Sequence, residues 1–225
     1  RDNTLVWYKG DNGTPPSGVA DMPHRGQKGT MYEGGIRVPG IIEWPARISR
    51  PRVTGVPVVT SDILPTLAAL VGNSLPDRPI DGIDLTPLLD DIMTSRPSPI
   101  FFWSFDVDGL AERVNDPYIE PALQRGTTPL VKLMNGIKTR VFQNVHYTEA
   151  DPRDMSGPRV VMENDYKLVV GGSGGSGPEL FNLRDDPAET RNLAERRPRV
   201  LQELERKLEE WQWSILNSLT GADYR

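Results

Sequence analysis

Cysteine is absent from this chain of 225 residues. Disulfides, thiolate metal sites and a cysteine nucleophile are therefore excluded within it. Positive charge is also limited: the formal net charge is −5, and no basic stripe offers nucleic acid an electrostatic footprint. Every apolar run is far shorter than the roughly 20 residues that a membrane span needs. The sequence therefore predicts neither a nucleic-acid nor a membrane partner.

What is present suits a folded chain with many loops. Apolar residues make up 37% of the sequence, which is enough for a core, and 21 glycines and 21 prolines predict frequent turns. Strands and helices alternate early and strands cluster later, which predicts an α/β part followed by a small antiparallel sheet packed with a C-terminal helix. We place the boundary between residues 1–98 and 99–225.

Local patterns locate the elements of these two parts. Short apolar or β-branched runs predict buried strands, and apolar residues at steps of three and four predict helices. The expected strands are 4–8, 36–44, 99–105, 139–145 and 179–183, with a hairpin at 159–170 turning at Asn164 and Asp165.

The expected helices cover residues 61–72 and 198–219. Thr60 or Ser61 can cap the first of them, and Gly72 can close it. The second has an apolar stripe and an i,i+4 pair of Glu203 with Lys207. Residues 106–158 form a long charged excursion, and residues 171–177 form a glycine-rich connector.

Two adjacent side-chain oxygens follow the first expected strand, in Asp11-Asn12-Gly13. The end of a strand is where open α/β sheets bind ligands, and carboxylate and carboxamide oxygens suit a hard cation such as calcium. Asp-Asn-Gly is equally a good turn sequence. The residues alone leave both interpretations open.

A second candidate is Lys28, which lies in a loop between glycines. A tetrahedral oxyanion could approach both its ammonium and nearby backbone amides. The alternative is an ordinary solvated loop lysine. His24 lies four residues earlier and is a weaker candidate for substrate contact, because imidazole suits proton transfer.

Several segments together resemble the type I sulfatases, which belong to the alkaline phosphatase superfamily. They occur in the order typical of that family and cover most of residues 4–90 and 159–195. The segments are 4–13, the block Gly29-Thr30-Met31-Tyr32-Glu33-Gly34-Gly35-Ile36-Arg37-Val38-Pro39, then Trp44-Pro45, 61–67, 81–89 and 179–193.

The resemblance implies roles for the candidate residues. Asp11 and Asn12 would be calcium ligands, and Lys28 would contact the sulfate of a sulfate ester. Calcium and Lys28 would together neutralise charge on the sulfuryl group under attack. Lys9-Gly10 departs from the family, in which small hydroxyl residues are usual before the aspartate, so hydrogen bonds behind the metal ligands are expected to differ.

Other family features are missing from the sequence. The family's nucleophile is a formylglycine made in a C/S-x-P-x-R motif upstream of the metal-binding Asp-Asn pair, and no such motif precedes Asp11 here; Ser74-Leu75-Pro76-Asp77-Arg78 has the spacing but lies downstream of Lys28. The paired aspartates of the first metal-binding strand and the histidines beside the nucleophile are also missing. We therefore expect a C-terminal portion of a sulfatase, cut from a longer protein and inactive when isolated.

Such a portion would expose a sheet edge and apolar helix faces. We expect the N-terminal half of the same protein, a homo-oligomer or strand pairing with a neighbour to cover them. By resemblance alone the expected location is extracytoplasmic. Two alternative functions are a phosphodiesterase or phosphonate hydrolase of the same superfamily, and a non-catalytic module for packing or assembly.

Overall fold

The structure is a computed structural model that describes residues 2–15, 23–106, 133–134, 137–138, 147–172 and 177–223. It contains two compact units. One unit combines Arg1–Ser104 with Pro158–Trp211, and the other combines Phe105–Gly157 with Gln212–Arg225. All candidate residues belong to the first unit. The predicted boundary after residue 98 stays a prediction.

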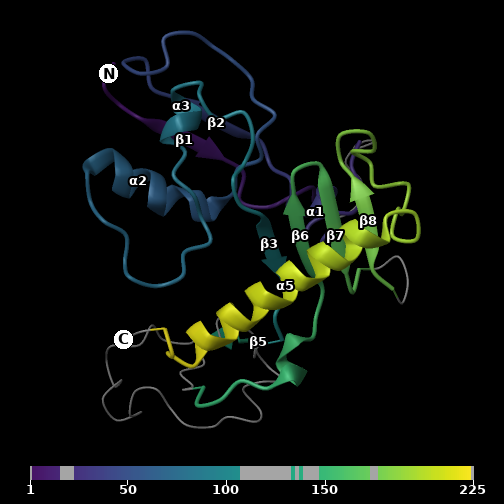
Figure 1. Cartoon of the computed structure of the whole chain (residues 1–225). Helices are drawn as coiled ribbons and strands as arrows, with labels where there is room; N and C mark the ends of the chain where they lie inside the picture. The colour runs from purple at the N-terminus through teal and green to yellow at the C-terminus, as the bar shows by residue number, and fades with distance from the viewer. Residues whose placement is uncertain are drawn as a thin grey trace. The chain divides into compact units, whose positions relative to one another are not determined.

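A four-stranded antiparallel sheet is the centre of the first unit (Figure 1). Its order is β3 (Ile100–Trp103), β6 (Arg159–Glu163), β7 (Tyr166–Val170) and β8 (Glu179–Asn182). Asn164 has φ of 53° in the tight turn between β6 and β7. The predicted hairpin and the predicted strands at its two sides are therefore confirmed.

One face of this sheet packs against α5 (Pro198–Leu219), which lies across it in Figure 1. The apolar stripe of the helix is confirmed, because Leu204 and Leu208 are each only 2% exposed. Lys207 also forms the predicted pair with Glu203, at 3.0 Å. The core between helix and sheet consists of Val161, Leu168, Leu180, Leu204 and Leu208.

The opposite face of the sheet packs against the segment that contains α1 (Glu33–Ile36). Side chains alternate between the two faces of a strand. The residues next in sequence to Val161, Leu168 and Leu180 therefore point to this side of the sheet. Tyr32 is buried there from the α1 segment. The core on this side consists of Tyr32, Val160, Val169 and Phe181. Tyr32, from the block Gly29 to Pro39, is thus part of the core.

Two short strands form a separate ribbon, β1 (Val6–Lys9) paired antiparallel with β2 (Gly40–Glu43). The prediction of a buried first strand is wrong, because Val6 is 51% and Tyr8 58% exposed. The described residues supply no layer that covers these side chains. The second strand is shorter than predicted, because the α1 helix takes up its first residue.

The helical part begins with η1 (Thr60–Asp62) and continues as α2 (Ile63–Val71). Gly72 closes it in the left-handed region at φ of 72°, as predicted. The predicted capping by Thr60 or Ser61 is wrong, since neither side chain makes a cap bond. The Asp62 side chain instead reaches back over η1, where its Oδ2 accepts from Val59 N at 2.8 Å. A short α3 (Thr86–Leu89) follows.

The second unit contains a two-stranded ribbon of β4 (Leu133–Met134) and β5 (Ile137–Lys138), and η3 (Pro152–Met155). The predicted strand 139–145 lies outside the described residues, as does most of the predicted connector 171–177. Within the described part of the chain, no helix has the length and apolar character required to cross a bilayer.

Candidate metal- and anion-binding site

Asp11 and Asn12 directly follow the β1 ribbon, which ends with a bond of 3.0 Å from Gly10 N to Pro39 O. Asp11 is exposed, and Asn12 is half-buried. Asn12 Nδ2 donates to Gly13 O at 3.0 Å. The described residues form no ion pair with Asp11 and donate no hydrogen bond to Asn12 Oδ1. Both side chains therefore have an oxygen available to a ligand.

The next two residues fix this loop to α1. Gly13 N donates to Gly35 O at 3.1 Å, and Thr14 N donates to Gly34 O at 2.8 Å. A Cβ at position 13 would lie 2.3 Å from Gly34 O, so only glycine permits this approach. The loop that carries Asp11 and Asn12 is thus held against Gly34 and Gly35 of α1.

The lysine-bearing loop lies beside it. Lys28 N donates to Thr14 O at 2.7 Å, although fourteen positions separate the two residues. The Lys28 side chain is exposed, and no described carboxylate forms an ion pair with it. The backbone therefore brings two of the predicted site segments together and leaves the ammonium free to contact an anion.

His24 has a different neighbour. Its Nδ1 lies 3.1 Å from the carbonyl oxygen of Pro187, in the loop that follows β8. With Nδ1 protonated, the ring would donate to that carbonyl and present Nε2 as an acceptor. The predicted contact of His24 with substrate stays a prediction.

The donor chemistry of the Asp11–Asn12 loop fits part of a calcium site. Calcium takes about six to eight oxygen ligands, and a carboxylate with a carboxamide supplies suitable ones. The described residues hold no group of three or more His, Cys, Asp or Glu arranged for a metal. A complete site at this loop therefore requires further oxygens from water, substrate or other residues.

A buried ionic cluster lies behind the site, and the sequence patterns did not indicate it. Lys167 Nζ lies 3.0 Å from Glu33 Oε1 and 2.8 Å from Glu189 Oε1. The side chains of Lys167 and Glu189 are both 0% exposed, and that of Glu33 is 5% exposed. Glu189 Oε2 also accepts from Glu33 N at 2.7 Å. The cluster joins α1, β7 and the loop after β8.

The surroundings of this cluster change the pKa of Glu189. Burial raises the pKa of Glu189, and Lys167 and the Glu33 amide oppose that rise without cancelling it. The physical cause is the cost of holding a charged carboxylate away from water. The neighbouring Glu33 carboxylate adds to the rise.

A second cluster fastens the beginning of the lysine-bearing loop. Arg25 Nη1 donates to Glu179 Oε1 at 2.9 Å, and the Tyr32 hydroxyl donates to Glu179 Oε2. The Arg25 guanidinium lies 3.8 Å from the centroid of the Tyr32 ring, a cation–π arrangement. Both ends of the 25–32 loop are therefore attached to β8.

The motif after β8 builds the loop that presents Glu189. Asp186 Oδ2 accepts from Thr190 N at 2.9 Å and from Arg191 N at 2.8 Å. Asn182 Oδ1 accepts from the amides of Arg184 and Asp185. These polar side chains have structural roles in the turn, which the family resemblance did not reveal.

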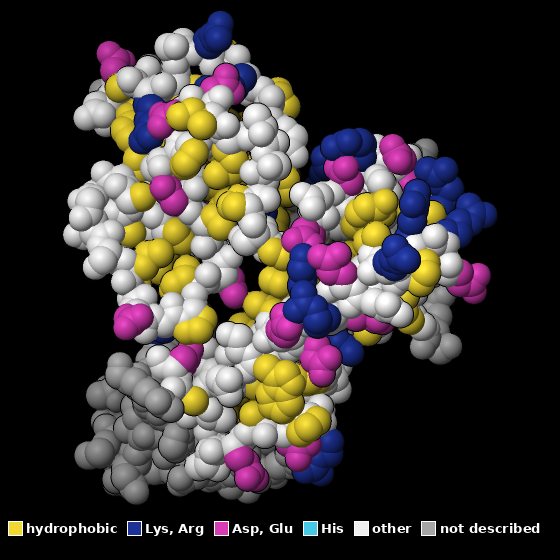
Figure 2. Space-filling view, in the orientation of Figure 1, with side chains coloured by type: hydrophobic (Ala, Val, Ile, Leu, Met, Phe, Trp, Pro, Cys, Tyr) yellow, Lys and Arg dark blue, Asp and Glu magenta, His cyan; other side chains and the backbone are white. Residues whose placement is uncertain are grey.

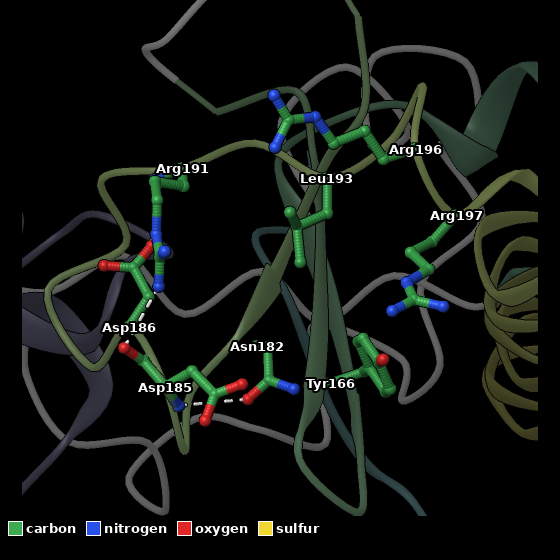
Figure 3. A pocket seen from close by; sticks show the side chains of 8 residues that line it. All are labelled: Tyr166, Asn182, Asp185, Asp186, Arg191, Leu193, Arg196 and Arg197. Atoms are coloured by element: carbon green, nitrogen blue, oxygen red, sulfur yellow. Dashed lines mark hydrogen bonds between the residues drawn. The ribbon is translucent and has the colours of Figure 1, made fainter.

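The same loop borders a pocket of about 340 Å³ (Figure 3). Its lining includes Arg191, Arg196 and Arg197 with Tyr166 on one side. A second pocket of about 350 Å³ lies near Arg96. Neither of these pockets is lined by the predicted metal or sulfate residues. The predicted site residues therefore lie outside both of these cavities.

Comparison with known proteins finds similarity to sulfatases over part of the chain. Residues 1–73 match the family model described as Sulfatase. The chain is 42% identical over 108 residues to arylsulfatase A of Bos taurus, covering 45% of this chain and 20% of the relative. It is also 42% identical over 96 residues to steryl-sulfatase of Mus musculus, covering 38% of this chain and 15% of the relative.

Solved structures show the same fold over almost the whole chain. The crystal structure of Ps i-CgsB matches with a TM-score of 0.64 at 21% identity, covering 95% of this chain and 37% of that protein. The PsFucS1 sulfatase of a Pseudoalteromonas species matches with a TM-score of 0.60 at 23% identity, covering 95% and 38%. The chain thus spans little more than a third of these structures and about a fifth of arylsulfatase A.

Proposed function

We propose that the chain, whose residues 1–73 match the family model described as Sulfatase, supplies the calcium- and sulfate-binding part of a sulfuric ester hydrolase. The observation that carries the proposal is the bond of 2.7 Å from Lys28 N to Thr14 O. It holds the loop with the free ammonium beside the loop with the free oxygens of Asp11 and Asn12. A cation and an anion bound to the two loops would therefore be neighbours.

Each residue has a definite task in this proposal. Asp11 contributes a carboxylate and Asn12 its Oδ1 to calcium, which when bound stabilises negative charge on sulfate oxygens. Lys28 contacts the sulfate directly as a compact positive charge. Its ammonium stabilises the charge that develops on the sulfuryl oxygens while the ester bond breaks. His24 is a further candidate for contact with the substrate.

The nucleophile would come from another part of the same protein, because the sequence has no cysteine and its only S-x-P-x-R segment, Ser74 to Arg78, lies downstream of Lys28 and not upstream of Asp11 as in the family. The similar solved structures are more than twice as long as the region matched here. In this proposal, that other part of the protein covers the apolar side chains that are exposed around β1, β2 and α2 (Figure 2). They are Val6, Tyr8, Ile41, Leu64, Leu67 and Val71, each at least 43% exposed.

The metal assignment is tested with terbium, a luminescent substitute for calcium that nearby aromatic rings sensitise. We expect the 225-residue chain to give saturable terbium luminescence that calcium displaces. Asp11→Ala should abolish it, because the one carboxylate proposed as a ligand is lost. Asp77→Ala, which changes an exposed aspartate elsewhere, is the matched control. Equal luminescence in the Asp11 variant and the control would refute the metal site.

The sulfate assignment is tested by turnover of an aryl sulfate. The isolated chain should be inactive, and measurable turnover by it would contradict the proposal that the nucleophile lies in another part of the protein. In a longer form that includes the nucleophile, Lys28→Ala should lower kcat/KM by roughly 10²- to 10³-fold, the cost of losing one charge-stabilising contact. Lys207→Ala on α5 is the control and should keep the activity. A Lys28 variant as active as this control would overturn the role.

A further inference from the structure

The lysine-bearing loop is fastened at both ends to the four-stranded sheet. At its beginning, Arg25 pairs with Glu179 on β8 at 2.9 Å. At its end, Glu33 pairs with Lys167 on β7 at 3.0 Å. Glu179, Lys167 and the core residue Phe181 lie on the same face of the sheet, because antiparallel partners share a face and side chains alternate along each strand. Lys28 lies between the two attachments.

The second attachment continues to the metal-binding loop through the backbone. Glu189 Oε2 accepts from Glu33 N at 2.7 Å and fixes the first residue of α1. The next two residues of α1, Gly34 and Gly35, accept from Thr14 N and Gly13 N. The oxygen of Thr14 then accepts from Lys28 N. A continuous series of contacts thus leads from Lys167 and Glu189 to both halves of the site.

A buried ionic cluster is suited to this task because its geometry has few alternatives. One ammonium faces two carboxylates away from water, so any displacement of α1 would leave a charge without its partner. Glu189 has φ of 55°, a strained value for a residue other than glycine. The Asp186 bonds to Thr190 and Arg191 hold this conformation. The carboxylate is therefore presented to α1 by a built loop.

We propose that Lys167 and Glu189 are positioning residues that hold the Asp11–Asn12 loop and the Lys28 loop in register through Glu33. This inference adds residues that do not themselves bind a ligand. It rests on the proposed function, because the relative position of the two loops matters for binding calcium and sulfate together. The contacts themselves can be tested without metal or substrate. Failure of the terbium experiment with intact positioning would remove the proposed function and keep this inference.

Amide hydrogen exchange followed by NMR is the direct test, on the full chain. The reporting amides are those of Gly13, Thr14 and Lys28, which donate to Gly35, Gly34 and Thr14. The reference amides are those of Ser104 and Leu183, which donate to Pro158 and Asp165 at 2.8 Å and report on the sheet. Comparing the two sets separates local loosening from global unfolding.

Lys167→Met should accelerate exchange at the reporting amides by roughly tenfold or more relative to the reference amides. Lys207→Met is the matched control. Lys207 pairs with Glu163 at 2.5 Å and with Glu203 at 3.0 Å, and neither of these partners belongs to α1. The control should leave the reporting amides unchanged. Equal acceleration of reporting and reference amides in the Lys167 variant would overturn the proposal.

Two substitutions of Glu189 make the test independent of whether Lys167→Met folds. Glu189→Gln keeps an oxygen that can accept from Glu33 N, so it should retain the protection of the reporting amides. Glu189→Ala removes that acceptor and should lose the protection selectively. If Gln and Ala behave alike, the Glu189 contact does not hold the register and the inference is wrong.

Discussion

Glu189 and Glu33, two acidic residues separated by 156 positions, are joined in the core by a hydrogen bond of 2.7 Å. The carboxylate of Glu189 accepts from the backbone amide of Glu33, while Lys167 lies within 3.0 Å of both side chains. Two like charges can share this place only because the ammonium is between them. This hydrogen bond links the first residue of α1 to the loop after β8, and it has measurable consequences.

The first consequence is a dependence of stability on pH. Burial raises the pKa of Glu189 above its ordinary value of 4.5. The folded chain therefore holds this proton more tightly than the unfolded chain does. The resulting stabilisation is complete below 4.5 and is lost as the pH rises through the raised pKa. The groups that face Glu189 are Lys167 from β7, Glu33 from α1 and Arg25, whose Nη1 donates to Glu189 O.

Glu189→Gln removes this titration. The free energy of unfolding of the wild type, relative to that of the Gln variant, should fall as the pH rises from about 4 to about 7. Urea unfolding followed by circular dichroism at several pH values measures the difference. A difference that stays constant, or that grows with pH, would show that Glu189 is not held with a raised pKa.

Asp186 should show the opposite sign. Its burial acts to raise the pKa, but bonds from Arg191 N and from the amide and hydroxyl of Thr190 outweigh burial, so the pKa of Asp186 is lowered from 3.8. The stabilisation from this carboxylate is present above 3.8 and is lost as the pH falls through the lowered pKa.

The stability difference between wild type and Asp186→Asn should therefore shrink on acidification, measured by urea unfolding at neutral and acidic pH. Exposed Asp185→Asn is the neighbouring control and should show a small and nearly constant difference. An Asp186 difference that widens at low pH would contradict the assignment.

The third prediction concerns the close contact at Gly13. Gly13→Ala would place a Cβ 2.3 Å from Gly34 O, so the Asp11–Asn12 loop and α1 would have to separate. We expect a loss of about 1–3 kcal/mol in the free energy of unfolding, the usual cost of overpacking. Urea unfolding measures it, and Gly55→Ala is the control, because nothing lies within 4 Å of a Cβ at that position. Equal stability of the two variants would contradict the close approach.

The sequence predicted those elements whose signals are local. The alternating strands around Asn164 and the stripe of α5 were found at nearly their correct bounds, because turn residues and apolar periodicity act within a few positions. Gly72 was assigned correctly for the same reason. The α1 helix was missed, since its four residues contain two glycines and no periodic pattern.

The site was predictable only in part. The resemblance selected Asp11, Asn12 and Lys28, and the backbone bond from Lys28 to Thr14 brings their two loops together. Lys167 could not be selected, because one lysine in a strand carries no sign of a partner such as Glu33, 134 positions away. Burial of β1 was predicted from composition, but burial requires a covering layer, which no composition guarantees.

Asp62 and Arg96 provide the last prediction, in a place remote from metal and sulfate chemistry. Arg96 Nη1 and Nη2 donate to Asp62 Oδ2 and Oδ1 at 2.7 Å and 2.8 Å, and the side chains are 3% and 0% exposed. The same carboxylate accepts from the amides of Val59 at 2.8 Å and Ile83 at 2.9 Å. One aspartate thus joins the start of α2 to the segment that leads into α3.

Arg96→Met would leave the Asp62 charge buried without its cation. Loss of one partner from such a pair costs about 3–5 kcal/mol, so the urea midpoint should fall markedly. Arg206→Ala, which breaks an exposed i,i+4 pair with Glu210 on α5, should change the free energy of unfolding by no more than about 0.5 kcal/mol. The contrast follows from burial, because water and salt screen the second pair and cannot reach the first. Similar midpoints for the two variants would show that Asp62 is accessible to water in solution, and its proposed role in joining the two segments would then fail.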